Sequence, residues 1–234
     1  MVNRTVIDEL KQDAIAFKKS KLYRGLSAVL IPLSMFVPYA LAQNWIESAN
    51  IWLMGLAMIL AIIILIYDLK HPKAKAWHTR NWKKIMLSII SAFLIAVFTI
   101  LIGLIFSHLM QSDNLSSQNQ QLIVKEYKQN PLSLILLVSF IAPIFEETIY
   151  RRDIVRFTSK KAFWISSIIT IIAFDLSHLM QTSLIALLPA FGQYLIPSIG
   201  LWAVYAKTKT IWCSMLTHCI YNFLTILSIM LVIG

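Results

Sequence analysis

The chain has 234 residues, of which 58% are hydrophobic and 14% are charged, and its formal net charge is +10. A soluble globular domain of this size needs a more polar surface than this composition supplies, so that class of protein is excluded. The positive charge is divided among several short segments between apolar runs, a distribution that argues against a nucleic-acid-binding surface.

Long apolar runs predict an all-α, polytopic transmembrane bundle. Residues 25–46 and 85–106 are each 22 residues without a charge, and residues 48–67 are 20, whereas about 20 apolar residues cross a bilayer. We expect about seven spans in total. The front half, residues 23–106, is expected to support the rest of the bundle behind a cytoplasmic N-terminal segment at 1–22. Its three spans are expected at 23–43, 51–67 and 85–106.

The back half, residues 132–234, holds nearly all the polar side chains that interrupt apolar runs, and we expect it to form a four-helix catalytic core. It follows residues 107–131, which are rich in Ser, Gln and Asn and predict a partly disordered or capping loop outside the membrane. The sixth span contains two prolines and two glycines, so we expect it to be kinked or broken. The four helices of this core are expected at 132–158, 162–180, 183–205 and 211–232.

The basic residues indicate how the chain is oriented in the membrane. All but Lys125 and Lys128 of the 21 Lys and Arg residues precede the first span or fall in connections on the same side of the membrane. This positive-inside pattern predicts a multi-pass protein of the plasma membrane with a cytoplasmic N-terminus and basic segments close to the lipid bilayer.

Two adjacent carboxylates, Glu146 and Glu147, end an apolar segment at residues 132–145. A charged side chain at bilayer depth costs roughly 2.5–3.5 kcal/mol on insertion scales, so each carboxylate needs a partner, a proton or a function. Arg151 is four residues after Glu147, on the same helix face, and can pair with it. Glu146 has no such local partner. The alternative without a catalytic role is a structural ion pair at a helix end.

Two further polar clusters lie on other predicted helices. His178 ends an apolar helix, and Asp175 can either orient its imidazole or pair with a basic residue. His218 and Asn222 are four residues apart, so both project from one face of the last helix. Each cluster has a structural alternative, because a lone histidine is more often a packed residue and a His/Asn pair can join helices through hydrogen bonds.

The positions of these clusters leave their convergence open. Residue 162 is midway between Glu146 and His178, so a helical hairpin that turns there brings the two to a similar depth. His218 lies about 10 Å into its helix by rise alone and matches that depth less well. Gln193 and Tyr194, between the prolines of the sixth span, form a weaker cluster that can line a cavity.

If the clusters converge, two kinds of chemistry can use the same residues. Glu146, in a site of low dielectric, suits general-base activation of a water that an imidazole also holds, and His218 with Asn222 can donate to a developing oxyanion. Alternatively, Glu146, His178 and His218 supply the three ligands of an open catalytic zinc site. The HExxH pattern of soluble zinc proteases is absent.

Together, the three clusters resemble the motifs of the CPBP family, the CAAX prenyl proteases and bacteriocin-processing or immunity proteins that are also called the Abi family. Its motifs EExxxR, FxxxH and HxxxN occur here in that order, on separate predicted helices, within about residues 132–228. Arg152 departs from the pattern, in which glycine usually follows the first motif. The matching residues are Glu146, Glu147 and Arg151, then Phe174 and His178, then His218 and Asn222.

The resemblance implies an intramembrane endopeptidase with the site inside a helical bundle. By motif position, Glu146 and His178 would activate the water, and His218 and Asn222 would stabilise the oxyanion. The cofactor would be zinc or none. The supporting residues would be Glu147, Arg151, Asp175 and Phe174.

Three functions are compatible with these features. The leading hypothesis is a protease that cleaves a membrane-associated or secreted peptide, or a protein substrate, in bacteriocin processing or self-immunity. The second is a non-catalytic immunity protein that binds and shields a membrane target. The third is a small transporter in which Glu146 relays protons. Replacement of Glu146 discriminates among them, since it abolishes cleavage under the first hypothesis, leaves protection intact under the second and stops flux driven by a pH gradient under the third.

Overall fold

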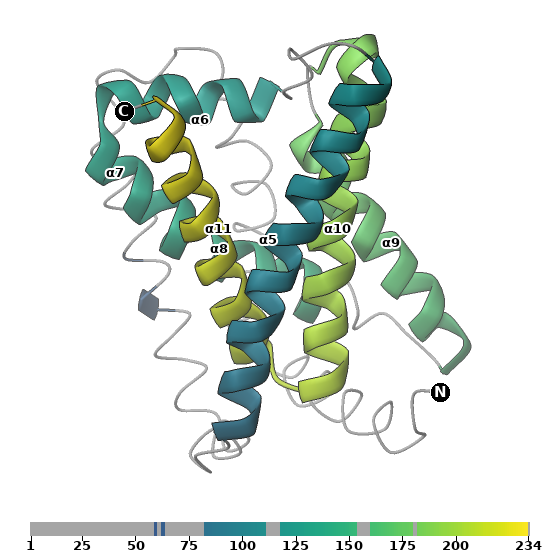
Figure 1. The fold of residues 1–234 in the computed structure, drawn as a ribbon. Helices are drawn as coiled ribbons and strands as arrows, with labels where there is room; N and C mark the ends of the chain where they lie inside the picture. Colours follow the sequence, from purple (N-terminus) through teal and green to yellow (C-terminus); the bar gives the residue numbers. More distant parts are fainter. Residues whose placement is uncertain are drawn as a thin grey trace.

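A computed structural model of the protein describes residues 59, 62–63, 82–110, 118–153, 160–179 and 182–233. The expected N-terminal segment and the first two expected spans lie outside these residues, apart from positions 59, 62 and 63. All described elements are helical, and the described residues contain no strand (Figure 1). The helices are α5 (Trp82–Met110), α6 (Gln118–Gln129), α7 (Pro131–Leu136), π-helix η2 (Leu137–Ile141), α8 (Ala142–Glu146), π-helix η3 (Glu147–Asp153), α9 (Lys160–His178), α10 (Leu184–Thr208) and α11 (Ile211–Ile233).

The prediction of a helical membrane protein is confirmed, whereas the count of seven spans is not. Within the described residues, four helices are long and apolar enough to cross a membrane, and Trp164–His178 is a shorter apolar helix. Many large apolar side chains on these helices are exposed, as expected where lipid takes the place of water. The four long helices are Trp82–Met110, Pro131–Arg151, Leu184–Thr208 and Ile211–Leu231.

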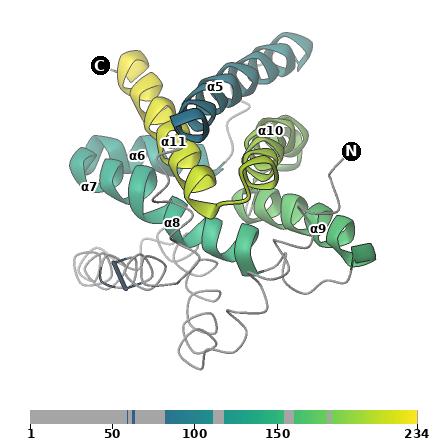
Figure 2. The ribbon, with the colours of Figure 1, turned by 90° about the horizontal axis from the view of Figure 1, so that it is seen from below.

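The elements α7, η2, α8 and η3 follow one another without a break and form one helix of mixed register, Pro131–Asp153. Figure 2 shows α11 between this helix and α5, and α10 between α5 and α9. The buried apolar cluster between them consists of Ile149, Tyr150, Phe174 and Leu201. It lies directly beside the two glutamates in the chain, so the site and the core are built by the same helices.

Residues 118–129 are helical, where the sequence predicts a partly disordered or capping loop. Helix α6 runs crosswise to α5 and α11 (Figure 1). Leu122 and Tyr127 are half-buried, whereas Gln121 and Lys125 are exposed, and this one-sided pattern, without Gly or Pro, favours a helix lying on an apolar surface. Loop composition alone conceals this, because Gln and Lys are also good helix formers.

Helix α10 is continuous from Leu184 to Thr208 and contains both Pro189 and Pro197, so of the two expectations for this span, a kink or a break, the break is wrong. Membrane helices tolerate proline because neighbouring groups take over the freed hydrogen bonds. The glycines serve packing instead. A Cβ atom at Gly200 would lie 2.6 Å from Ile95, and one at Gly192 would lie 2.8 Å from Phe106, so both glycines allow α5 to approach α10 closely.

Candidate active site

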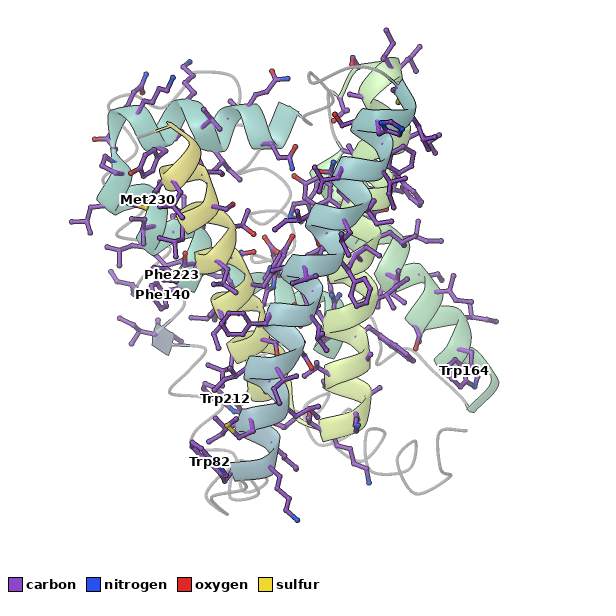
Figure 3. The ribbon with its side chains drawn as sticks, viewed as in Figure 1. Trp82, Phe140, Trp164, Trp212, Phe223 and Met230 are labelled. Atoms are coloured by element: carbon purple, nitrogen blue, oxygen red, sulfur yellow. The ribbon has the colours of Figure 1, made fainter. Side chains whose placement is uncertain are left out.

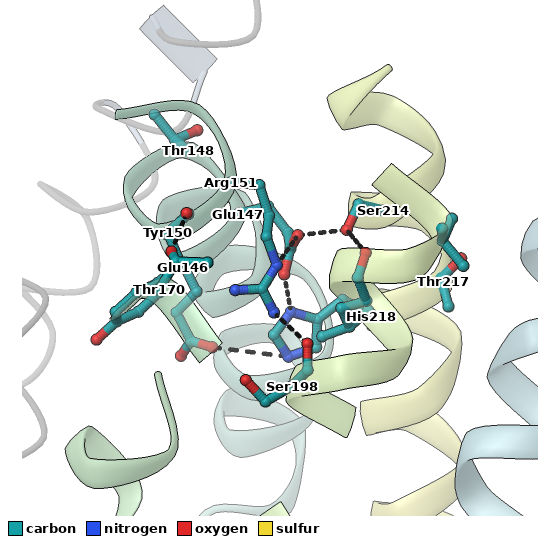
Figure 4. A network of polar contacts seen from close by, with 12 residues as sticks. Glu146, Glu147, Thr148, Tyr150, Arg151, Thr170, Ser198, Ser214, Thr217 and His218 are labelled. Atoms are coloured by element: carbon teal, nitrogen blue, oxygen red, sulfur yellow. Dashed lines mark hydrogen bonds and ion pairs between the residues drawn. The ribbon is translucent and has the colours of Figure 1, made fainter. Parts of the chain in front are cut away.

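The polar residues of the three motifs come together where α8, η3, the end of α9 and α11 meet. Figure 4 shows Glu146, Glu147 and Arg151 on one helix, facing His218 of α11 across a network of polar contacts. His178 is the last residue of α9 and reaches the same place, since its Nε2 lies 4.0 Å from Glu146 Oε2. The convergence that the sequence left open is therefore present in the structure.

Glu147 is the centre of this network and is fully buried. Its Oε1 lies 3.0 Å from His218 Nδ1, and its Oε2 accepts a hydrogen bond from Ser214 Oγ. Arg151 Nε lies 3.4 Å from the same Oε2, and this side chain is fully buried as well. The predicted Glu147–Arg151 pair is thus present, and the additional hydrogen bonds offset part of the cost of desolvating the Glu147 carboxylate.

The Arg151 guanidinium has two further contacts that hold it in place. Its Nη2 lies 3.4 Å from the carbonyl oxygen of Ser198 on α10. Its Cζ lies 4.9 Å from the centre of the Phe174 ring, over the face of that ring. Arg151 therefore links η3 to both α9 and α10, and the Phe174 ring lies against its guanidinium.

Glu146 has different surroundings. Its side chain is 19% exposed, and its Oε2 lies 3.6 Å from His218 Nε2 and 4.0 Å from His178 Nε2. These separations exceed a hydrogen bond, and among the described residues this buried oxygen has no hydrogen-bond partner. At such distances one water can contact the carboxylate and a ring nitrogen at the same time. The arrangement is suited to holding a small polar ligand between Glu146 and the imidazoles.

Both imidazoles are anchored through Nδ1 and turn Nε2 toward Glu146. His178 Nδ1 lies 2.8 Å from the carbonyl oxygen of Phe174, and His218 Nδ1 lies 3.0 Å from Glu147. A carbonyl and an ionised carboxylate only accept, so each Nδ1 carries the proton and donates it. The His178 ring also stacks against Phe174 and Tyr194, with centroid distances of 4.7 and 4.9 Å.

Two predicted site residues occupy places that the sequence did not indicate. Asp175 is fully buried, and within the described residues neither of its carboxylate oxygens has a hydrogen-bond partner. The predicted orientation of His178 by Asp175 is not seen, because a backbone carbonyl and Ser177 Oγ approach the imidazole Nδ1 instead. Asn222 Nδ2 donates to the carbonyl oxygen of Val138 at 2.8 Å, so this hydrogen bond of its amide is made to a backbone group.

Sequence reasoning missed Ser214 and underrated Tyr194. Ser214, His218 and Asn222 follow one another at intervals of four residues, so one face of α11 carries three polar side chains. This spacing could have indicated that Ser214 faces the site together with His218. The sequence indicates Tyr194 only as part of a weak cluster that can line a cavity. Its ring lies against the His178 ring, a contact that depends on how α10 packs on α9.

The donor types for a zinc ion are present, although their spacing is wide. Glu146 and the Nε2 atoms of His178 and His218 are the carboxylate and imidazole ligands that zinc uses, and imidazoles hydrogen-bonded through Nδ1 are typical of metal ligands. Two ligands of a tetrahedral zinc lie about 3.4 Å apart, compared with 3.6 and 4.0 Å here. Among the described residues, no group of three His, Cys, Asp or Glu side chains is arranged to hold a metal ion.

Comparisons with known proteins agree with the motifs. A chain from Bacillus subtilis (strain 168), named "Putative membrane peptidase YdiL", is 26% identical over 207 residues, which are 83% of this chain and 79% of that protein. An "Uncharacterized protein" from Mycoplasma capricolum subsp. capricolum is 27% identical over 197 residues, which are 79% of this chain and 56% of that protein. No solved structure gives a significant match.

The family model described as "Type II CAAX prenyl endopeptidase Rce1-like" matches residues 128–224. This segment contains all three motifs, the helices that carry the first two, and the part of α11 that carries the third. The resemblance that the motifs indicate is therefore confirmed, and over residues 128–224 the chain matches the Rce1-like type II CAAX prenyl endopeptidases.

Proposed function

We propose that the protein is an intramembrane endopeptidase that hydrolyses a peptide bond in a membrane-associated substrate. The observation that carries this proposal is the position of Glu146, whose Oε2 faces His178 and His218 inside an apolar bundle and has no hydrogen-bond partner in the part of the chain that the structure describes. The match to a family of CAAX-type endopeptidases supports the same reaction class. A transporter would need a path for its cargo, and no observation favours one.

In the proposed reaction, a water lies between Glu146 and His178. It donates one hydrogen bond to the Glu146 carboxylate and one to His178 Nε2, whose lone pair is free because Nδ1 carries the proton. Glu146 removes a proton as the water oxygen attacks the peptide carbonyl carbon, and it returns that proton to the amine that leaves. His178 thus orients the water, and Glu146 acts as the base and then as the acid.

His218 is proposed to stabilise the negative oxygen that forms in the transition state. Its Nδ1–H is held by Glu147, which directs Nε2 toward the site, and in the proposed transition state an N–H at Nε2 donates a hydrogen bond to the oxyanion. The buried Arg151 and the Ser214 hydroxyl keep Glu147 in place. The proposed second oxyanion donor, Asn222, stays a prediction from the family motif.

The same residues leave a zinc-dependent variant of the mechanism open. Glu146, His178 and His218 would have to draw closer together than they lie here to hold the ion, which would supply Lewis-acid polarisation of the peptide carbonyl. Metal analysis of the purified protein, together with activity measured before and after treatment with a chelator, distinguishes the two variants. Full activity in metal-free protein excludes the zinc variant.

The proposed location is the plasma membrane, with the N-terminus in the cytoplasm. Trp82, Trp164 and Trp212 lie toward the same end of the bundle (Figure 3). At that end α5, α9 and α11 begin and α10 ends (Figure 1), and Lys83 and Lys207 are exposed there. Aromatic rings indicate a membrane interface at this end, and the basic residues support its being the cytoplasmic one, in line with the positive-inside prediction.

Cleavage of defined peptides by the purified protein tests the proposal. One quenched fluorescent peptide would end in a farnesylated Cys-aliphatic-aliphatic-X sequence, as the family description suggests, and a second would have the same sequence without the lipid. We expect cleavage by the wild type and loss of at least about 100-fold in kcat for Glu146→Gln, because a general base contributes about 10²–10⁴-fold. Mass spectrometry of the fragments gives the scissile bond.

The matched control is Ser228→Ala, which removes an exposed hydroxyl on α11 that bonds only within its own helix. It should cleave at the wild-type rate. Cleavage at the wild-type rate by Glu146→Gln would refute the assignment of Glu146. Roles in bacteriocin processing or self-immunity, by cleavage or by binding alone, stay predictions. Protection of cells by the Glu146→Gln variant would favour binding.

A further inference from the structure

The amide of Asn222 contacts the helix that carries the glutamates, several residues before them. Asn222 Nδ2 donates to the carbonyl oxygen of Val138 at 2.8 Å. Val138 lies in the π-helix η2, Leu137–Ile141, and the side chain of Asn222 is half-buried between the two helices. One of the two amide N–H groups of the residue that the family motif assigns to the oxyanion is thus bonded to the backbone.

The chain itself explains why this carbonyl needs a donor. In the π register of η2, the N–H of Ala142 donates to the carbonyl of Leu137. The next donor in that register would be residue 143, bonding to Val138. Residue 143 is proline, which has no N–H. A carbonyl without its donor is costly inside a membrane, and side chains of neighbouring helices are the usual replacement.

Asn222 and His218 hold the helix on both sides of Pro143. His218 Nδ1 bonds to Glu147, and Asn222, one turn farther along α11, bonds to Val138. Glu146 lies between these two attachments, only three residues after the proline. The distance of Glu146 Oε2 from the imidazoles therefore depends on how the turn that contains Pro143 is held against α11.

We propose that Asn222 is a positioning residue whose amide replaces the N–H that Pro143 lacks, and that it thereby fixes Glu146 opposite His178 and His218. This inference deepens the proposed function and rests on it for the catalytic consequence. The pairing of Asn222 with the Pro143 gap is itself independent of any substrate. It differs from the oxyanion role, in which Asn222 would act on the substrate and its contribution would not depend on residue 143.

A double-mutant cycle tests the pairing, with the wild type, Asn222→Ala, Pro143→Ala and the double variant. With Pro143 present, we expect Asn222→Ala to lower the melting temperature in detergent by about 2–4 °C. We also expect kcat on the farnesylated peptide to fall by about 10- to 100-fold with little change in KM, because Glu146 is displaced. In the Pro143→Ala background a backbone N–H is available, so the same replacement should change kcat by less than about threefold.

Ser228→Ala serves as the control on the same helix and should show no coupling to residue 143. Asn222→Leu, which keeps the volume without the donor, replaces Asn222→Ala if that variant does not accumulate. Equal losses of kcat from Asn222→Ala in both backgrounds, without a coupled change in melting temperature, would overturn the proposal and assign Asn222 to the oxyanion. Coupled melting temperatures in a protein that cleaves neither peptide would uphold the pairing and refute only the proposed function.

Discussion

At the scale of the residue, the two adjacent glutamates have separate tasks because they point in different directions. Neighbours on a helix are about 100° apart around its axis. Glu147 therefore faces the packed interior, where Arg151, His218 and Ser214 surround its carboxylate. Glu146 faces the histidine Nε2 atoms and has an oxygen free to bind a ligand. One carboxylate is a buried structural charge and the other is available for chemistry.

The buried pair gives a prediction about stability. Glu147→Gln leaves the Arg151 guanidinium fully buried without its carboxylate, so we expect it to destabilise the protein by about 3–5 kcal/mol. Most of that loss comes from the uncompensated charge. The double variant Glu147→Gln/Arg151→Met should therefore recover most of the stability and yet stay inactive, because His218 has lost its anionic partner. Thermal unfolding in detergent and peptide cleavage measure the two effects.

Glu146→Gln is the matched control for this experiment. It alters the neighbouring carboxylate in the same way, but among the described residues no Lys or Arg pairs with that carboxylate, so the melting temperature of this variant should stay close to that of the wild type. A Glu147→Gln protein that melts at the wild-type temperature would contradict the structural role of the pair.

Residue patterns anticipated some of these contacts and could not anticipate others. The spacing of four between Glu147 and Arg151 predicted their pairing, because helix geometry determines it. An interhelical hydrogen bond from the His218/Asn222 pair was one of the alternatives that the sequence left open, but the partners of His178 and Asn222 were out of reach, since both are backbone carbonyls. Whether a backbone carbonyl can accept such a hydrogen bond depends on the local helix register, which the pattern of side chains does not reveal. The convergence itself also depended on helix ends and tilts that spacing does not determine.

At the scale of the element, helix α10 shows how composition can mislead. Two prolines and two glycines suggested a break, but the helix is continuous. In a membrane, close packing between helices comes from small residues that let backbones approach. The glycines of α10 meet Ile95 and Phe106 of α5, and this contact holds α5 beside the helix to which Arg151 bonds. The length and apolar character of α5, α10 and α11 were predictable, whereas the partners of their small residues were not.

Gly200 is the position where this packing can be tested. Its substitution by Ala would place a Cβ atom 2.6 Å from Ile95, so the helices must separate, and we expect a loss of about 1–3 kcal/mol. Gly103→Ala is the matched control, because its Cβ would lie 3.2 Å from the amide end of Gln193, a flexible group that can move. Thermal unfolding of both variants measures the difference.

A second substitution makes the cause specific. Ile95→Ala removes the side chain that the new Cβ would meet, so the pair Gly200→Ala/Ile95→Ala should lose less stability than the sum of the two single variants. Strict additivity would show that the close approach of α5 to α10 at this position is not what makes glycine necessary.

At the scale of the whole molecule, the two ends of the bundle differ in the side chains that they expose. Trp82 and Trp164 are 66% and 48% exposed, and they lie toward the end where Lys207 is exposed (Figure 3). Phe140 and Phe223 are exposed between the two ends, where lipid tails would meet them. The amphipathic helix α6 lies at the opposite end (Figure 1), at the interface that this orientation places outside the cell.

Cysteine labelling in intact cells tests this orientation. In a background with Cys213 and Cys219 replaced by serine, we would compare Gln121→Cys on α6, Lys207→Cys at the end of α10, and Phe223→Cys in the apolar middle of α11. A membrane-impermeant maleimide should label Gln121→Cys in intact cells, because the proposed orientation places its exposed side chain at the outer interface. Lys207→Cys should react only after the cells are permeabilised, since basic residues stay on the cytoplasmic side.

Phe223→Cys controls for access through the bilayer, because its side chain is 45% exposed on an apolar helix face and water does not reach it there, so it should be labelled in neither condition. The reverse pattern, with Lys207→Cys labelled in intact cells, would show that the bundle has the opposite orientation in the membrane. It would also place Trp82 and Trp164 at the outer interface, contrary to the positive-inside distribution of the chain. Helix α6 and the end of α10 lie at opposite ends of the bundle, so residues 121 and 207 must be on opposite sides of the membrane in either orientation. Labelling of both cysteines in intact cells would contradict the transmembrane arrangement itself.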